Sequence, residues 1–221
     1  MLGYVFMALG AMLAAYLIGS ISFAVIFSKI FTGKDVRDSG SGNAGATNTL
    51  RTVGVLPGLL TFLFDAIKGF AACYVGKTVF EYIYSSYQSE IFTPIYGAYL
   101  CCVMVMIGHI FPIFFGFKGG KAVACSVGTF AVCCPIAIIL GLCGFAVSLI
   151  ISKIVSLSSL IATVIVVGTS VIYQFVGSGV NYNIIPVIIL SLIAGYIVFI
   201  KHKENIKRLI KGEEKKISSR K

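Results

Sequence analysis

Residues 39–51 read SGSGNAGATNTLR and place glycines, amides and hydroxyls directly before an arginine. Gly40, Gly42 and Gly45 allow the backbone to turn several N–H groups to one side, which makes a concave site for an anion. Arg51 adds a planar, two-pronged cation that matches the geometry of a phosphate. A flexible glycine-rich loop is the alternative. The phosphate-binding residues predicted here are Ser41, Gly42, Asn43, Gly45, Asn48 and Arg51.

A second polar segment, GHIFPIFFGFKGGKAVAC, covers residues 108–125. Lys118 and Lys121 flank Gly119 and Gly120 just before an expected helix, and amides at a helix N-terminus together with two lysines form a phosphate cradle. The segment is not a Walker A motif, because Ala122 stands where Ser or Thr is required, so ATP is not predicted. A basic anchor on the inner side of a membrane is the alternative.

Two further polar groups lie nearer the C-terminus. Ser156 and Ser159 share a face near the start of an apolar helix and are predicted, like Arg208, to bind substrate. Helix capping is the alternative role of the two serines. His202, Asn205 and Arg208 follow the last apolar run at spacings of three, so they can face one way on a helix. A solvated amphipathic tail is the alternative for this last group.

Asp65 and Lys68 lie inside an apolar run at spacing i, i+3. An unpaired charge at the bilayer centre costs about 2.5–3.5 kcal/mol on insertion scales. The two side chains are therefore expected to pair and to face the protein interior or a water cavity. They could support a site or form a structural ion pair, and His109 could support the same site, cap a helix or simply pack.

The elements that must position these residues are membrane helices. Of 221 residues, 58% are hydrophobic and only 12% charged, so lipid is the expected solvent for most of the chain. The fold class is all-α and polytopic, with a single integral-membrane domain over residues 1–200 and a basic tail over 201–221. Pro135 divides the apolar residues 122–151 into two short spans or one bent helix. Seven spans are predicted, at about 3–30, 54–79, 94–115, 121–134, 135–152, 157–175 and 182–200.

The distribution of charge decides the number of spans and their orientation. With seven spans and the N-terminus outside, nearly all Lys and Arg side chains fall on the cytoplasmic side and Lys77 falls outside. Attraction to the anionic membrane surface accounts for the net charge of +10 without a nucleic-acid partner. The seven cysteines lack zinc-ligand spacing, so they are expected to pack between helices and no metal is predicted.

Several phosphate-type sites on one side of a membrane indicate two anionic substrates, at least one of them lipid-like. No G-x-S-x-G or H-E-x-x-H motif is present. The rival hypothesis is a transporter for an organic phosphate, although transporters place their sites near mid-bilayer and often contain repeats.

The polar segments resemble those of the bacterial acyl-phosphate:glycerol-3-phosphate acyltransferases of the inner membrane. Ser22 departs from the family's usual proline, and Ala122 and Cys125 depart from its usual GGKGVAT, so Ala122 is not expected to provide a glycine-like backbone. The resembling segments are GSISFA (19–24), GKDVRDSGSGNAGATNTLRTVG (33–54), FDAIKG (64–69), GHIFPIFFGFKGGKAVA (108–124), VSLSS (155–159) and HKENIKRL (202–209).

The resemblance implies a reaction in which acyl phosphate acylates the 1-hydroxyl of sn-glycerol 3-phosphate, giving lysophosphatidic acid and inorganic phosphate. An acyl phosphate is already activated, so no cofactor, coenzyme A or ATP is expected, and positioning and electrostatics supply the rate. His202 could accept the hydroxyl proton, or a substrate phosphate could do so while His202 and Asn205 position the reactants. The residues of 118–121 are assigned to the acyl phosphate and those of 41–51 chiefly to glycerol phosphate, an assignment that could be exchanged. The predicted catalytic residues are His202, Asn205, Lys121 and Arg51.

Overall fold

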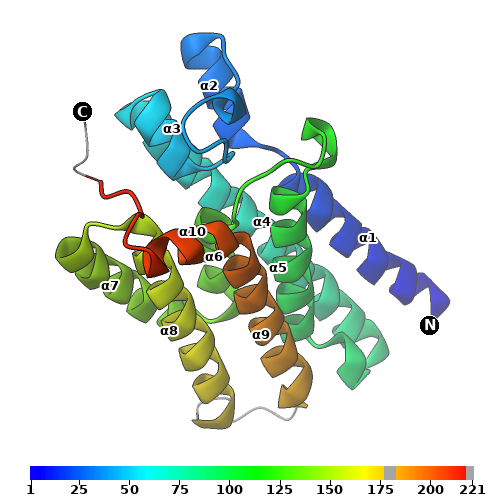
Figure 1. Ribbon diagram of the computed structural model, residues 1–221. Helices are drawn as coiled ribbons and strands as arrows, with labels where there is room; N and C mark the ends of the chain where they lie inside the picture. The colour runs from blue at the N-terminus through cyan, green and yellow to red at the C-terminus, as the bar shows by residue number, and fades with distance from the viewer. Residues whose placement is uncertain (177–182, 218–221) are drawn as a thin grey trace. The chain divides into compact units, whose positions relative to one another are not determined.

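The computed structural model describes residues 1–176 and 183–217, and these are helical with no strand (Figure 1). The chain divides into two compact units, Met1–Cys133 and Cys134–Lys221. Each unit is described by itself below. Whether residues 1–200 form a single membrane domain stays a prediction.

The first unit is built around one long helix, α4, which packs against α1, α5 and α6. Small residues allow these close contacts, as is usual between membrane helices. A side chain at Gly128 of α6 would overlap the carbonyl oxygen of Ala66 on α4, and one at Gly108 of α5 would overlap that of Tyr16 on α1. The unit contains α1 (Leu2–Gly19), α2 (Phe23–Thr32), η1 (Val36–Asp38), α3 (Ala46–Thr52), α4 (Val55–Tyr87), η2 (Glu90–Phe92), α5 (Pro94–Ile110), η3 (Ile113–Phe115) and α6 (Val123–Cys133).

The second unit is a smaller helical group in which α8 packs against α7 and α9. A buried contact of 3.2 Å joins the hydroxyls of Ser170 on α8 and Ser191 on α9. The short helix α10 follows α9 directly and carries Lys203, Lys207 and Arg208. The unit contains α7 (Pro135–Ser152), α8 (Val155–Val176), α9 (Ile184–Lys201) and α10 (Lys203–Ile210).

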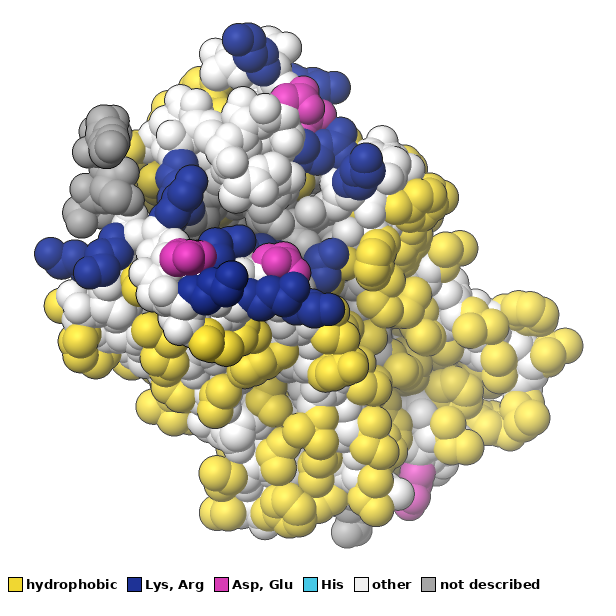
Figure 2. Space-filling model, in the orientation of Figure 1, with side chains coloured by type: hydrophobic (Ala, Val, Ile, Leu, Met, Phe, Trp, Pro, Cys, Tyr) yellow, Lys and Arg dark blue, Asp and Glu magenta, His cyan; other side chains and the backbone are white. Residues whose placement is uncertain are grey.

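Six of the described helical segments are long and apolar enough to cross a membrane. Within each unit, Figure 2 shows Lys and Arg side chains gathered toward one end, while hydrophobic side chains cover much of the visible flanks of the helices. This distribution is the one expected of a protein whose helix flanks face lipid. The six segments are Leu2–Thr32, Val55–Tyr87, Pro94–Phe115, Pro135–Ser152, Val155–Val176 and Ile184–Lys201.

The span predicted at about residues 3–30 lies within the candidate span Leu2–Thr32, but its helix is interrupted. α1 ends at Gly19, Ser22 is extended (φ −93°, ψ 91°), and α2 starts at Phe23. The break is stabilised from outside the run, because the ammonium of Lys68 donates to the carbonyl oxygen of Ile21 at 2.7 Å.

The apolar residues 122–151 form two helices, so the alternative of one bent helix is wrong. The break lies at Cys134, and Pro135 occupies the first turn of α7, where its missing N–H costs nothing. α6 has 11 residues, about 16 Å of helix, against a hydrocarbon core about 30 Å thick. Its own crossing, and with it the total of seven spans and their orientation, stays a prediction.

Candidate active site

In the first unit, Arg37 ties the first polar loop to the second. Its guanidinium forms a two-pronged pair with Asp35, from Nε to Oδ1 at 3.0 Å and from Nη2 to Oδ2 at 2.8 Å. Its Nη1 donates to the carbonyl oxygens of Phe115 at 2.6 Å and Lys118 at 3.2 Å. The hydrogen bond from Arg37 lowers the pKa of Asp35, and the same bond raises the pKa of Arg37, so both are charged at neutral pH. Sequence reasoning missed Arg37, although its place beside the glycine-rich loop was visible.

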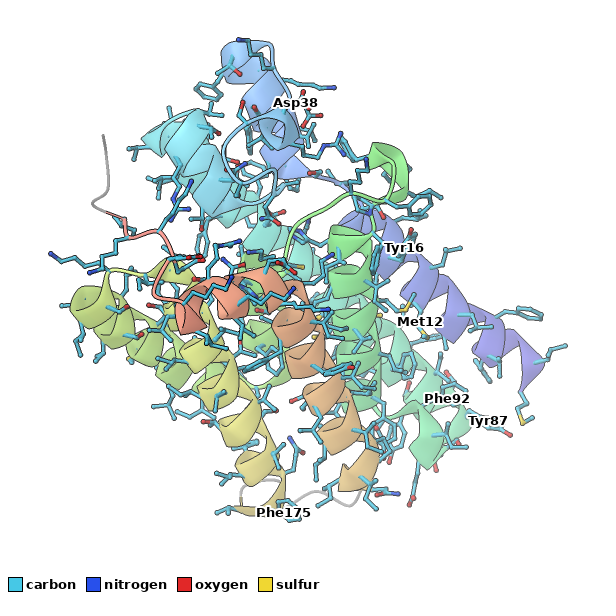
Figure 3. The ribbon with its side chains drawn as sticks, viewed as in Figure 1. Met12, Tyr16, Asp38, Tyr87, Phe92 and Phe175 are labelled. Atoms are coloured by element: carbon cyan, nitrogen blue, oxygen red, sulfur yellow. The ribbon has the colours of Figure 1, made fainter. Side chains whose placement is uncertain are left out.

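The two loops enclose a hollow of about 420 Å³. It brings together two residues predicted to bind phosphate, Gly42 and Lys118. Asp38, on the loop between α2 and α3 (Figure 3), also lines it, so the wall carries charges of both signs. The lining residues are Asp35, Arg37, Asp38, Gly42, Phe115, Gly116 and Lys118.

Asn48 shapes the first loop with its side chain. It is buried, and its Nδ2 donates to the carbonyl oxygens of Val36 and Ser39, each at 3.0 Å. Its Oδ1 accepts the N–H of Ser41 at 2.9 Å. Both amide donors are thus used by the loop itself, and the expectation that Asn48 donates directly to a phosphate is replaced by a loop-shaping role.

The backbone of this loop differs from the predicted anion nest. Gly40 and Gly42 have left-handed φ values of 66° and 68°, but Gly45 is extended at −153°. The N–H of Gly42 donates to the carbonyl of Ser39 and that of Gly45 to the carbonyl of Asn43. The glycines therefore close the loop on itself. The side chains of Ser41 on the loop and Arg51 on the last turn of α3 are exposed, while Asn43 is half-buried.

The second loop folds back on the end of α5. The N–H groups of Gly119 and Gly120 donate to the carbonyl oxygens of Ile110 and His109, each at 3.1 Å. A side chain at Gly119 would overlap the His109 carbonyl, and one at Gly120 would overlap the His109 ring. These glycines permit close packing, so their predicted role as amide donors in a cradle is wrong.

Ala122 does adopt the glycine-like backbone that it was not expected to provide. Its φ is +62° and it is buried, one residue before α6 begins. Lys121, which precedes it, is half-buried and lies outside the described lining of the hollow, whereas Lys118 is exposed on that lining.

Asp65, Lys68 and His109 form one buried network. The Lys68 ammonium lies 2.7 Å from Asp65 Oδ1, and His109 Nδ1 lies 3.5 Å from the same oxygen. The side chains of Asp65 and Lys68 are only 1% and 3% exposed, so the prediction that the pair faces the protein interior is confirmed. The carbonyl oxygen of His109 also accepts the N–H of Gly120, so the network supports the second loop. That these three residues support the active site, rather than only the packing of the helices, stays a prediction.

In the second unit, two side chains predicted to bind substrate, Ser156 and Arg208, and one predicted to be catalytic, Asn205, converge on one carboxylate. Ser156 Oγ and Asn205 Nδ2 donate to Glu214 Oε1 at 2.9 and 2.7 Å, and Arg208 Nε donates to Oε2 at 2.6 Å. Burial raises the pKa of Glu214, but the hydrogen bonds from Asn205, Arg208 and Ser156 outweigh it, so the pKa lies below its ordinary value. Ser159 does not join this cluster and donates to the carbonyl oxygen of Val155.

His202 is buried at the junction of α9 and α10. Its Nδ1 lies 2.8 Å from the carbonyl oxygen of Val198. A carbonyl can only accept, so Nδ1 carries the proton of the neutral ring and Nε2 holds the lone pair. This tautomer suits a general base that acts through Nε2.

Comparison with known proteins identifies the family that this chain matches. The family described as glycerol-3-phosphate acyltransferase matches residues 9–212. A glycerol-3-phosphate acyltransferase 2 of Bacillus anthracis is 38% identical over 93% of this chain and 97% of its own length. A glycerol-3-phosphate acyltransferase of Anaeromyxobacter sp. (strain K) is 37% identical over 95% of this chain and 98% of its own.

Two solved structures are also similar. The crystal structure of PlsY (YgiH), an integral membrane glycerol 3-phosphate acyltransferase, in its glycerol 3-phosphate form has a TM-score of 0.78 and 31% identity. Its lysophosphatidic acid form has a TM-score of 0.75 and 29% identity. Each match covers 96% of both chains.

Proposed function

This chain belongs to the glycerol-3-phosphate acyltransferase family, and we propose that it acylates the 1-hydroxyl of sn-glycerol 3-phosphate with acyl phosphate as the donor. Glycerol 3-phosphate is proposed as the acyl acceptor because this chain matches, over 96% of both chains, a solved structure in its glycerol 3-phosphate form. The donor is argued from chemistry, because the described residues offer cations for a second phosphate and the family resemblance implies acyl phosphate.

In the proposed reaction the hydroxyl oxygen attacks the acyl carbonyl carbon. A new ester bond forms, the bond between the acyl carbon and the phosphate oxygen breaks, and inorganic phosphate leaves. The hydroxyl proton moves to His202 Nε2 or to a phosphate oxygen of a substrate. Because the mixed anhydride is already activated, alignment of the two substrates and neutralisation of both phosphates supply most of the rate.

The side chains have separate tasks in this proposal. Lys118 and Lys121 neutralise the acyl phosphate, and Arg51 with Ser41 and Asn43 holds the glycerol phosphate, or the two sets exchange substrates. Asn48, Gly119 and Gly120 hold the loops in shape, and Gly42 lines the hollow beside Lys118.

In the second unit, Asn205, Ser156 and Arg208 offer hydrogen-bond donors that suit an anion, and all three donate to the carboxylate of Glu214. His202 acts as the base or as a positioning group. Ser159 supports the start of α8 through its bond to the helix backbone.

We also propose that the protein lies in the bacterial inner membrane with seven spans, the N-terminus outside and the polar loops and tail in the cytoplasm. The six apolar helices and the gathering of Lys and Arg at one end of each unit support this arrangement. The acyl chain then lies between helices, open to membrane lipid. A transporter is not retained, because the family and the solved structures that this chain matches are glycerol-3-phosphate acyltransferases.

The test is an assay on purified protein in detergent. Palmitoyl phosphate and glycerol 3-phosphate are expected to yield inorganic phosphate and lysophosphatidic acid without ATP, and palmitoyl coenzyme A in place of palmitoyl phosphate is expected to give no product. Turnover with the coenzyme A ester alone would overturn the donor, and phosphate release that does not depend on glycerol 3-phosphate would overturn the acceptor.

Variants test the phosphate assignments. Arg51→Ala and Lys121→Ala are each expected to lose most activity while elution on size exclusion stays unchanged. Near-normal turnover in both variants would remove these two residues from the site.

A further inference from the structure

Three cysteine thiols meet inside the first unit. Cys73 on α4, Cys102 on α5 and Cys133 at the end of α6 place their sulfur atoms within 4.8 Å of one another. All three are buried, at 0%, 0% and 6% exposure. Each comes from a different helix, so the cluster lies where three helices of the bundle meet.

A fourth sulfur atom lies beside the three thiols. The thiol of Cys102 lies 3.8 Å from the thioether sulfur of Met106, one helical turn away. Thr129, on the turn of α6 before Cys133, is also buried and donates its hydroxyl to the carbonyl oxygen of Ser126 at 3.0 Å. Cys101 is equally buried but lies outside the cluster, so burial of cysteine alone does not produce the convergence.

We propose that Cys73, Cys102 and Cys133 form a binding site for a thiophilic cation, zinc(II) or copper(I). Zinc–thiolate bonds of about 2.3 Å place ligand sulfur atoms roughly 3.8 Å apart, so the observed cluster needs to contract by only about 1 Å. Soft sulfur ligands select zinc and copper(I) over magnesium and calcium. This site departs from the sequence-based expectation that the cysteines only fill space between helices.

The balance of charge favours zinc. All three thiols lose their protons to solvent on binding, because a thiol that coordinates a metal ion is deprotonated. Three thiolates leave a net charge of −1 around zinc(II) and of −2 around copper(I). Zinc therefore leaves less uncompensated charge among the apolar helices. The bound cation would join α4, α5 and α6 at one point and stabilise the bundle, apart from the loops that are proposed to bind substrate.

The test is elemental analysis of the protein purified without a metal-affinity column. The wild-type protein is expected to hold close to one zinc or copper ion per chain. The element that is found decides between zinc(II) and copper(I). Cobalt(II) added to metal-free protein is expected to give thiolate-to-metal charge-transfer absorption. Cys73→Ala and Cys133→Ala are each expected to lower the affinity for the metal ion by more than roughly 10- to 100-fold, the loss that removal of an outer-shell partner causes.

Cys101→Ala is the matched control, because it removes an equally buried thiol from the neighbouring position on α5 and is expected to keep the metal. If a variant fails to fold, the proposal is still tested by counting the free thiols of the denatured wild-type protein. Absence of both metals from the wild-type protein together with no cobalt absorption, or two thiols lost to a disulfide, would overturn the proposal. Equal metal loss in Cys101→Ala and the cluster variants would also overturn it.

Discussion

Replacement of Glu214 by Gln is predicted to release the segment that follows α10. The substitution keeps the shape of the side chain but removes the charge that pairs with Arg208, and it turns one acceptor oxygen into an NH₂ donor. That donor then faces the donors of Asn205 and Ser156 or that of Arg208. A gel-filtration profile like that of the wild type would show that the effect is local.

The expected magnitude follows from these contacts. The Arg208 side chain is 41% exposed, so loss of its charge partner is discounted to about 1 kcal/mol. The Glu214 side chain is 6% exposed, and a buried donor that faces another donor costs about 1–3 kcal/mol. Local stability should therefore fall by about 2–4 kcal/mol, a roughly 30- to 1000-fold rise in the opening of this segment.

Hydrogen exchange of residues 203–217 measures this opening directly. Glu214→Asp, which keeps the charge on a shorter side chain, should lose less protection than Glu214→Gln. Because the folded pKa of Glu214 lies below its ordinary value, its contribution is present above the unfolded pKa, about 4.3, and is lost as pH falls through the folded pKa. Protection should thus be flat from neutral pH down to about 5. Wild-type protection in the Gln variant would refute the reasoning.

Three other substitutions test the supports of the first unit. Arg37→Ala removes the side chain that joins the two loops, so the KM for a phosphorylated substrate should rise about tenfold, about 1.4 kcal/mol, with partial recovery in Arg37→Lys; an unchanged KM would argue against this coupling. Gly120→Ala should lower the Tm in detergent, since overpacking costs about 1–3 kcal/mol, whereas Gly10→Ala, with open space around it, should not. Lys68→Met leaves Asp65 buried without its cation and should destabilise by about 3–5 kcal/mol, and the double variant with Asp65→Asn should recover much of that loss in thermal unfolding.

Hydropathy and charge predicted the helices and the interior ion pair, because lipid leaves few alternatives for an apolar run or a buried charge. The same patterns missed the break at residues 20–22. Only Ser20 and Ser22 interrupt the apolar run there, and the break is stabilised by a contact with Lys68, 47 residues away from Ile21. A local pattern does not contain a contact of that kind.

The candidate site shows the same limit at the level of single side chains. Sequence reasoning found the polar residues but assigned them to a ligand, whereas the structure uses Asn48, Gly119 and Gly120 to close the loops. Residue type predicts that a side chain can donate a hydrogen bond, but only the fold decides which acceptor it reaches.

Glu214 was missed for a related reason. It is one of three acids in a basic tail, and no periodicity relates it to Ser156, which lies 58 residues earlier. The cluster of donors around it nevertheless has a physical logic. Hydroxyl, amide and guanidinium groups that stabilise a carboxylate in the folded chain are the groups that also suit a phosphate. The residues that hold the C-terminal segment in place are therefore also suited to bind a substrate anion. If Ser156→Ala loosens residues 203–217 and raises the KM in the same proportion as Glu214→Gln, the cluster is a structural support; if Ser156→Ala raises the KM while protection is kept, it contacts substrate directly.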